Sequence, residues 1–237
     1  MGMRKRGWNA FRLSGIAGYF WKGAAIAVLI SFAGMLLLRW WTPPTSAFMI
    51  WQRLAGVRIN YRWVPLERIS PYAALAVVAS EDQNFFNHHG FDFDAIADAI
   101  KENRSRKRPR GASTISQQVV KNLFLWPGRD YFRKGLEAYL TLLMELLWPK
   151  QRILEVYLNI AEMGRGIYGV EVASRRFFGK PAARLTMHEA ATLAAVLPNP
   201  KQMSAARPSD YVRNRTWQII EQMHALGGKH WIQAAAY

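Results

Sequence analysis

The chain has 237 residues, of which 51% are hydrophobic, and it carries 32 Lys and Arg against 16 Asp and Glu, a formal net charge of +16. This length allows one good-sized domain with an appendage and excludes two large enzymatic domains, while the apolar content excludes disorder over most of the chain. The positive charge predicts an anionic partner, for which nucleic acid, an acidic membrane surface and a phosphate-bearing substrate are the candidates. Because the chain has no cysteine, disulfides and thiolate metal sites are excluded, which fits either the cytoplasm or an oxidising compartment.

The first predicted element is a membrane-spanning helix over residues 20–41. Residues 23–38 contain no charged side chain, and as a helix they rise roughly 24 Å, short of a hydrocarbon core of about 30 Å. Lys22 and Arg39 can snorkel at the two ends, and the aromatic residues beside them prefer the interface. More cations precede this segment than closely follow it, so the positive-inside rule predicts that residues 1–19 are cytoplasmic and that the rest of the chain lies outside.

A cleaved signal peptide is the alternative interpretation, because the apolar segment is short and close to the N-terminus. Cleavage requires small residues after the apolar run, whereas residues 39–44 are Arg-Trp-Trp-Thr-Pro-Pro. We therefore favour a membrane anchor that ends at Pro43 and Pro44. Residues 42–61 are expected to form a juxtamembrane linker, in which the apolar and aromatic residues 48–54 rest near the bilayer.

Helical signals dominate the remaining domain, residues 62–237. Ser70 is an N-cap candidate with Pro71 at the first helical position, and the helix that they begin carries Glu81 near its end. No stretch alternates over enough residues to require a strand, so the predicted fold class is mainly α. Further helices are predicted from a capping box at Thr186 to Pro198, from Ser209 to the Gly227-Gly228 pair, and over residues 113–125, 136–147 and 153–158.

Residues 104–110 contain five cations in seven residues. Such a charge run is usually a solvated, mobile loop. The alternative interpretation is a flexible, positively charged flap beside an anionic binding groove, with Gly111 as its hinge.

The helix predicted over residues 113–125 has a polar side that includes Thr114, Gln117 or Gln118, and Lys121. A helix N-terminus that follows a glycine, with hydroxyls in its first turn and a lysine two turns along, suits a phosphate. The alternative is that the glutamines are surface residues and the lysine a solvated charge. Three cations that follow directly favour the phosphate site: Arg129, Arg133 and Lys134.

Two glutamates bracket this basic stretch. Glu81 and Asp82 are followed by Phe85 and Phe86, so an apolar surface could raise a carboxyl pKa toward the working pH, as a general base requires. Glu137, taken alone, could be no more than the ion-pair partner of a cation four residues earlier.

His88 and His89 could be catalytic or metal-binding residues. Two neighbouring histidines without a carboxylate at ligand spacing are a weak metal signal. We therefore favour a structural role in which His88 forms a hydrogen bond with the loop before Gly90.

Four motifs in fixed order make residues 70–200 resemble the peptidoglycan glycosyltransferases of family 51. They read Glu81-Asp82-x-x-Phe85-x-x-His88-x-Gly90, Gly111-Ala112-Ser113-Thr114-Ile115-x-Gln117-Gln118-x-x-Lys121-Asn122, Arg133-Lys134-x-x-Glu137 and Lys150-x-x-Ile153-Leu154-Glu155-x-Tyr157-Leu158-Asn159.

This resemblance implies a mainly α, lysozyme-like fold of two lobes, with a groove that faces the membrane outside the cytoplasm. It also implies polymerisation of lipid II, with undecaprenyl diphosphate as the leaving group. By motif position Glu81 resembles the general base for the acceptor 4-hydroxyl, and Glu137 the second glutamate, which assists at the donor diphosphate. Lys121 and Arg129 resemble donor-phosphate ligands, and residues 104–110 fall where the family has a mobile flap. The other substrate-binding residues that the resemblance implies are Asp82, Phe85, His88, Gly90, Ser113, Thr114, Gln117, Gln118, Asn122, Arg133 and Lys134.

The resemblance has one departure, because Leu136 stands where some relatives have a Lys. The chain contains no Ser-x-x-Lys sequence and has no room for a transpeptidase domain, so it resembles a monofunctional enzyme of a Gram-negative inner membrane. No metal site and no required cofactor are expected, although a divalent cation, Mg²⁺ or Mn²⁺, is compatible with the diphosphate. The expected partners are lipid II, the growing glycan strand and the bilayer, with other cell-wall synthesis or division proteins as further candidates and no nucleic acid.

Two other functions compete with this one. A lytic enzyme that cleaves glycan also fits a lysozyme-like fold, but the basic surface suits a diphosphate substrate better. A non-enzymatic module that binds nucleic acid or anionic lipid would use the charge alone. The predicted topology disfavours nucleic acid, and the excess charge has a simpler use in holding the domain on an anionic bilayer.

Overall fold

The structure is a computed structural model that describes residues 7–103, 111–128 and 130–236. It divides into two compact units, Met1–Trp41 and Thr42–Tyr237. The first unit contains helix α1 (Gly7–Leu38). Within α1, Trp21–Leu38 has a mean hydropathy of 1.9 and is long and apolar enough to cross a membrane. The helix ends before the predicted span does, because the N–H groups of Trp40 and Trp41 both bond to the carbonyl of Leu37 in a closing turn.

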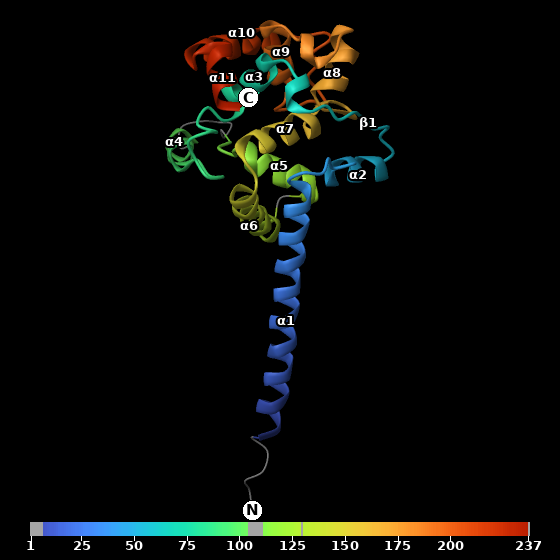
Figure 1. Ribbon diagram of the computed structural model, residues 1–237, viewed down its shortest axis with the longest axis vertical. Coiled ribbons are helices and arrows are strands. Elements are labelled where there is room, and N and C mark those ends of the chain that lie inside the picture. Colours follow the sequence, from blue (N-terminus) through green and yellow to red (C-terminus); the bar gives the residue numbers. More distant parts are fainter. Residues whose placement is uncertain (1–6, 104–110, 129, 237) are drawn as a thin grey trace, which may run out of the picture. The chain divides into compact units, whose positions relative to one another are not determined.

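The second unit consists of helices and one small sheet (Figure 1). Its α-helices are α2 (Ala47–Leu54), α3 (Pro71–Glu81), α4 (Phe93–Asn103), α5 (Ile115–Phe124), α6 (Tyr131–Leu147), α7 (Lys150–Ile160), α8 (Val170–Phe178), α9 (Met187–Val196), α10 (Asp210–Ala225) and α11 (Gly228–Ala236). Its strands are β1 (Asn60–Tyr61), β2 (Glu162–Gly164) and β3 (Ile167–Tyr168), and two 3₁₀ turns cover Leu66–Arg68 and Ala182–Arg184.

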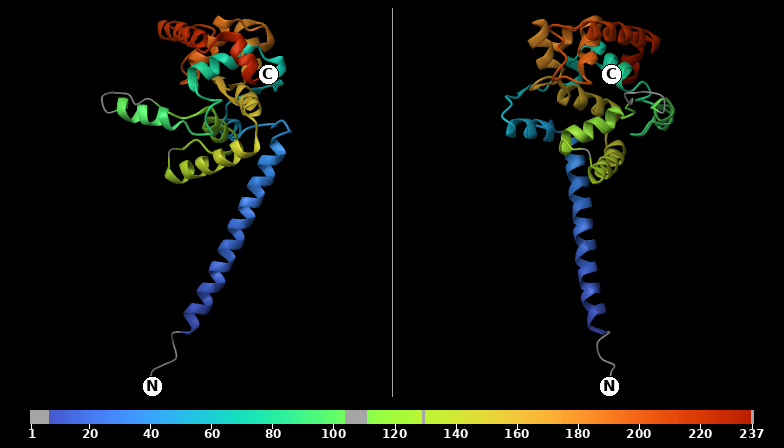
Figure 2. Two further views of the ribbon diagram at one scale, coloured as in Figure 1. Left: turned by 60° about the vertical axis from the view of Figure 1, so that its left-hand side comes forward. Right: turned by 180° about the vertical axis from the view of Figure 1, so that it is seen from behind.

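These helices form two lobes, as the sequence predicted. Helices α3, α8, α9, α10 and α11 gather at one end of the unit, and α4 and α6 extend from the other (Figures 1 and 2). Helix α5 lies between the lobes, where it packs against α2, α6 and α7. The mainly α, lysozyme-like fold is therefore confirmed.

The core of the first lobe is built on α3 and α9, which pack against each other and against α10. Residues 73–79 of α3 and 190–196 of α9 are all buried. Helices that are apolar on every side belong in a core rather than at a surface. Burial of α3 therefore holds Glu81, its last residue, at a defined point.

The predicted starts of α3, α9 and α10 agree with the structure, whereas α5 begins two residues later than predicted and α6 and α7 begin five and three residues earlier. Thr186 and Glu189 form the capping box of α9, and Ser209 accepts a hydrogen bond from Val212 N at the start of α10. Ser70 precedes α3 as predicted, but its hydroxyl does not cap the helix. It donates instead to the carbonyl of Leu185 at 2.8 Å, which ties the start of α3 to the segment before α9.

Residues 42–61, which we expected to be a linker, contribute α2 and β1 to the folded unit. Strand β1 pairs in parallel with β3, and β2 pairs antiparallel on the other side of β3. Tyr61 also donates a hydrogen bond to the carbonyl of Pro43 at 2.8 Å. The sequence did not predict these strands because two or three residues are too few to show alternation.

Candidate active site

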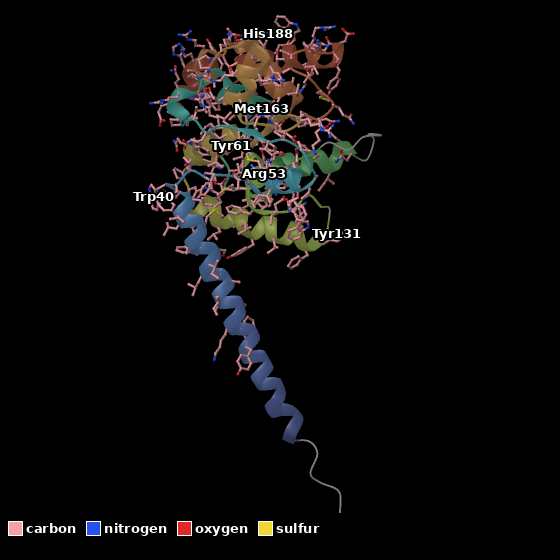
Figure 3. The ribbon with its side chains drawn as sticks, turned by 90° about the vertical axis from the view of Figure 1, so that its right-hand side faces the viewer. Trp40, Arg53, Tyr61, Tyr131, Met163 and His188 are labelled. Atoms are coloured by element: carbon pink, nitrogen blue, oxygen red, sulfur yellow. The ribbon has the colours of Figure 1, made fainter. Side chains whose placement is uncertain are left out.

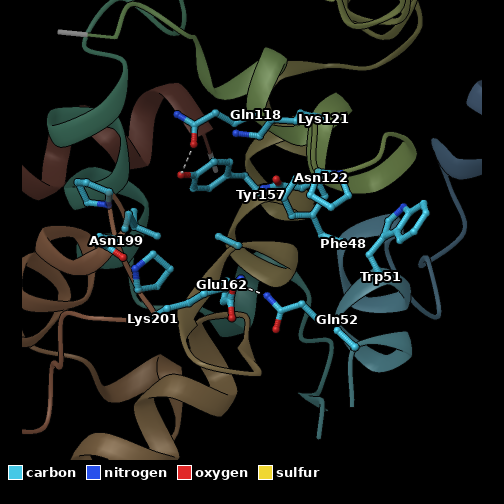
Figure 4. Close-up of a pocket in the computed structure, with 16 residues that line it drawn as sticks. Phe48, Trp51, Gln52, Gln118, Lys121, Asn122, Tyr157, Glu162, Asn199 and Lys201 are labelled. Atoms are coloured by element: carbon cyan, nitrogen blue, oxygen red, sulfur yellow. Dashed lines mark hydrogen bonds between the residues drawn. The ribbon is translucent and has the colours of Figure 1, made fainter. Parts of the chain in front are cut away.

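Glu81 receives an oriented hydrogen bond at the end of α3. Its Oε2 accepts from Gln118 Nε2 of α5 at 2.9 Å, and Gln118 Oε1 accepts from Tyr157 Oη of α7 at 3.1 Å. Figure 4 shows the Tyr157 to Gln118 bond beside Lys121. Because Tyr157 engages the amide oxygen, the amide nitrogen is directed at Glu81, and the carboxylate is held without an ion pair among the described residues.

The electrostatic setting of Glu81 suits a general base. Burial raises its pKa from the ordinary carboxyl value, while the hydrogen bond from Gln118 and the charges of Arg215 and Lys121 oppose that rise. Asp82 adds to it. The direction is the one that the sequence predicted, and a carboxylate with a raised pKa is a better proton acceptor near neutral pH.

Asp82, next to Glu81, is held by hydrogen bonds to two other segments of the chain. It is buried, its Oδ1 lies 2.9 Å from His88 Nε2, and its Oδ2 accepts from Ile115 N at the start of α5 at 2.9 Å. His88 Nδ1 accepts from Gly90 N at 3.1 Å, which assigns the ring proton to Nε2. The hydrogen bond that we expected between His88 and the loop at Gly90 is present.

Protein side chains accept hydrogen bonds from backbone N–H groups at the start of α5. Thr114 and Gln117 form a capping box, and Thr114 Oγ1 donates to the carbonyl of Gly90 at 2.7 Å. Gly90 has a φ of 89°, and a Cβ there would lie 2.8 Å from Thr141 Cγ2, so this position requires glycine. Together with Asp82, these contacts occupy the helix N-terminus at which the sequence suggested a phosphate.

Lys121 lies in the field of both glutamates. It is partly buried, and burial lowers its pKa, whereas the negative charges of Glu137 and Glu81 raise it again. The positive charges of Arg133 and Lys134 lower the pKa of Lys121, as burial does. A partly desolvated ammonium of this kind interacts strongly with an anionic ligand, because little water competes for it.

Glu137 is set very differently from Glu81. It is 3% exposed, its Oε2 accepts from Arg133 Nη1 at 2.8 Å, and its Oε1 accepts from Lys134 Nζ at 2.5 Å. The ion pair with Arg133 that the sequence offered as the plain interpretation is therefore present. Both carboxylate oxygens are engaged, so Glu137 orients cations and is not a free base.

Two cavities meet at Gln118. The first has a volume of about 550 Å³ and is lined by Lys121, Asn122 and Tyr157 together with residues of α2 (Figure 4). The second has a volume of about 780 Å³ and is lined by Glu81 and Ser113. Gln118 and Pro198 line both, so Glu81 and the partly buried Lys121 lie in neighbouring cavities with a shared wall.

The residues that the sequence singled out separate into two groups. The walls of these two cavities include Glu81, Asp82, Ser113, Thr114, Gln118, Lys121 and Asn122. They do not include Phe85, His88, Gly90, Gln117, Arg133, Lys134 or Glu137. Arg129 and the basic segment 104–110 lie outside the described residues.

Several cavity residues were missed from the sequence. Arg215 and Gln222 of α10 face the second cavity, while Trp51 of α2 and Lys201 line the first. The spacing of seven between Arg215 and Gln222 places them on one helix face, which was the available signal. Nothing in the sequence indicated which other helix that face would meet.

The described part of the chain has no group of three or more His, Asp or Glu residues placed to hold a metal ion. Asp82, which the sequence left open as a helper at a metal, is already engaged by His88 and by the N–H of Ile115.

Comparison with known proteins gives consistent matches. A family model described as "Transglycosylase" matches residues 50–224. A protein of Mannheimia succiniciproducens named "Biosynthetic peptidoglycan transglycosylase" is 56% identical over 205 residues, which cover 84% of this chain and 84% of that protein. Proteins with the same name from Yersinia pseudotuberculosis and Yersinia pestis are each 50% identical over 225 residues, covering 91% of this chain and 93% of each relative.

Proposed function

The chain belongs to the transglycosylase family, and from this we propose that it polymerises lipid II into linear glycan strands, with undecaprenyl diphosphate as the leaving group. The enzyme is a peptidoglycan glycosyltransferase, as are the relatives that it matches over most of their length. The observation that carries the lipid II proposal is that a partly buried, singly hydrogen-bonded Glu81 and the cation Lys121 line two cavities that share Gln118.

In the proposed reaction Glu81 accepts the proton of the acceptor 4-hydroxyl. The oxygen of that hydroxyl attacks the anomeric carbon of the donor, the bond from this carbon to the diphosphate oxygen breaks, and the configuration inverts. The raised pKa of Glu81 supports proton transfer at this step. Gln118 and Tyr157 fix the carboxylate while its charge changes.

The leaving diphosphate develops negative charge that fixed cations stabilise. Lys121, Arg133 and Lys134 are three cations against the one carboxylate of Glu137, so the group keeps an excess of positive charge. Charges held in place before the reaction stabilise a developing anion better than water does. Because protein cations can supply this charge, catalysis without a cofactor remains our expectation.

We also propose that α1 is a single-pass anchor of the inner membrane and that the catalytic unit is periplasmic. The length and hydropathy of Trp21–Leu38 support an anchor. In the catalytic unit, Trp51 and Leu54 of α2 are 48% and 76% exposed, and Tyr131 at the start of α6 is 98% exposed. Figure 3 shows where Tyr131 lies. Aromatic and aliphatic side chains of this kind suit the interface in which a lipid-linked substrate resides.

The decisive experiment supplies two substrates to the full-length enzyme. Labelled lipid II should be converted to a ladder of glycan strands on a gel, and Glu81→Gln should leave the lipid II unconverted. In parallel, finished peptidoglycan should release no muropeptides. Release of muropeptides without lipid II polymerisation would replace the proposed synthesis with lytic cleavage.

A further inference from the structure

Arg215 of α10 reaches the residue next to the proposed base. Its Nη2 lies 3.4 Å from the carbonyl oxygen of Ser80, which immediately precedes Glu81. Arg215 also lines the same cavity as Glu81 and Gln118. Because α10 packs directly against α3, this side chain approaches the base from a helix that none of the motifs singled out in the sequence includes.

The C-terminal end of a helix is an unfavourable place for a negative charge. Glu81 is the last residue of α3, where the unpaired carbonyl groups carry the negative end of the helix dipole. Ionisation of Glu81 is therefore opposed by these carbonyls as well as by burial. A cation at this helix end offsets both effects.

The charged groups around Glu81 come from three elements. Lys121 of α5 and Arg215 of α10 favour the ionised carboxylate, whereas the neighbouring Asp82 disfavours it. Tyr157 of α7 is buried, and its pKa is raised mainly by burial, so it stays neutral. The charge of Lys121 is shared with Glu137. Arg215 has no carboxylate within ion-pair distance among the described residues, so its charge is not shared with an ion-pair partner.

We propose that Arg215 is a positioning residue of the transglycosylation reaction, whose guanidinium keeps Glu81 ionised and fixes the end of α3. The proposal rests on the proposed function in one respect, because it takes Glu81 as the base. It gives a role in the reaction to a residue of α10, a helix that lies outside the four sequence motifs.

Two variants separate the charge of Arg215 from its hydrogen bond. Arg215→Gln keeps a donor for the Ser80 carbonyl and loses the charge, whereas Arg215→Lys keeps the charge and alters the donor geometry. Arg213→Gln is the matched control, because Arg213 is on the same helix, is exposed and pairs with Asp210.

The readout is the pH profile of kcat/KM for lipid II polymerisation by the full-length enzyme. Without the cation the pKa of Glu81 rises, so the acidic limb of Arg215→Gln should move to higher pH. Its loss of kcat/KM should be about tenfold greater at the acidic end of the profile than on the alkaline plateau. Arg215→Lys should keep the limb of the wild type, and Arg213→Gln should match the wild type throughout.

A purely structural role gives a different pattern. Equal losses at every pH in Arg215→Gln, together with a lower Tm, would overturn the proposal. A second measurement is independent of activity: carbon NMR titration of the Glu81 carboxyl, assigned with Glu81→Gln, in the wild type and in Arg215→Gln. The carboxyl should titrate at higher pH in the variant even if the enzyme does not polymerise lipid II, and an unchanged titration would overturn the proposal whatever the substrate.

Discussion

Glu81 and Glu137 occupy opposite electrostatic settings, although Glu81 is partly buried and Glu137 is buried. Glu81 has one neutral hydrogen-bond donor, Gln118, and no ion pair among the residues described. Glu137 has a cation on each oxygen, from Arg133 and Lys134. The same carboxyl group is thus prepared for proton exchange at one end of the site and for holding cations at the other.

This difference shows that environment, more than residue type, assigns the role. A carboxylate that gains a proton needs a pKa above the ordinary value, and burial without a salt bridge raises the pKa of Glu81. A carboxylate that organises cations needs them close by, and Glu137 has Arg133 at 2.8 Å and Lys134 at 2.5 Å. Charge-neutral substitutions at the two positions should therefore differ in kind.

The largest expected effect is on polymerisation by Glu81→Gln. The amide keeps the shape of the side chain and cannot accept the proton, so the rate should fall by about 10³-fold. Glu137→Gln keeps acceptor capacity for one cation and should lose about tenfold to a hundredfold. Initial rates with labelled lipid II measure both, and circular dichroism confirms folding. Equal losses at the two positions would remove the distinction between base and cation holder.

Lys121→Met should have the next largest effect, because it removes the partly buried cation that lies between the two glutamates. We expect a loss of about 10²-fold or more in kcat/KM, as for other charges that stabilise a developing anion. The matched control is Lys229→Met, an exposed lysine of α11, which should retain full activity. Full activity in Lys121→Met would place the leaving diphosphate elsewhere.

The sequence was sufficient to predict where α3, α9 and α10 begin and to single out both glutamates as candidate site residues. Local signals accounted for this success, since the ends of α3, α9 and α10 follow from Pro, Ser, Thr and Gly at known positions. The start of α5 was placed two residues early, because Thr114 is its N-cap and the helix begins at Ile115. A raised pKa for Glu81 was predictable because Phe85 and Phe86 lie four and five positions after it in the chain.

The sequence could not separate scaffold residues from cavity residues within a motif. Asn159 shows why: its Oδ1 and Nδ2 bond the N–H and carbonyl of Val64, 95 positions away in the chain, and so fix the fold rather than the substrate. Arg215 shows the converse, because it reaches the carbonyl of Ser80, next to Glu81, only through packing of α10 on α3. Both contacts depend on tertiary structure, which has no local signature.

A smaller effect is expected from Tyr157→Phe. This change removes the donor that orients Gln118, so Gln118 can turn its oxygen toward Glu81, and the rate should fall by about fivefold, equivalent to one neutral hydrogen bond. Tyr211→Phe, at an exposed tyrosine of α10, is the control and should behave as the wild type. A steeper loss, close to that of Glu81→Gln, would make Tyr157 a direct participant in proton transfer.

The smallest expected effect is on stability, and it has opposite signs at the two glutamates. Because the pKa of Glu81 is higher in the folded state than in the unfolded state, this residue contributes stability that is present below the unfolded pKa and lost as the pH rises through the folded pKa. Gln does not titrate, so the Tm of Glu81→Gln should exceed that of the wild type by about 2–4 °C at pH 8, with a smaller difference near pH 4.5.

Glu137→Gln should instead lower the Tm at pH 8, because Arg133 and Lys134 lose their carboxylate partner. Scanning calorimetry of both variants at the two pH values measures the signs. A lower Tm for Glu81→Gln at pH 8 would mean that the surroundings of Glu81 stabilise its carboxylate, as those of Glu137 do. The contrast between the two glutamates would then not hold.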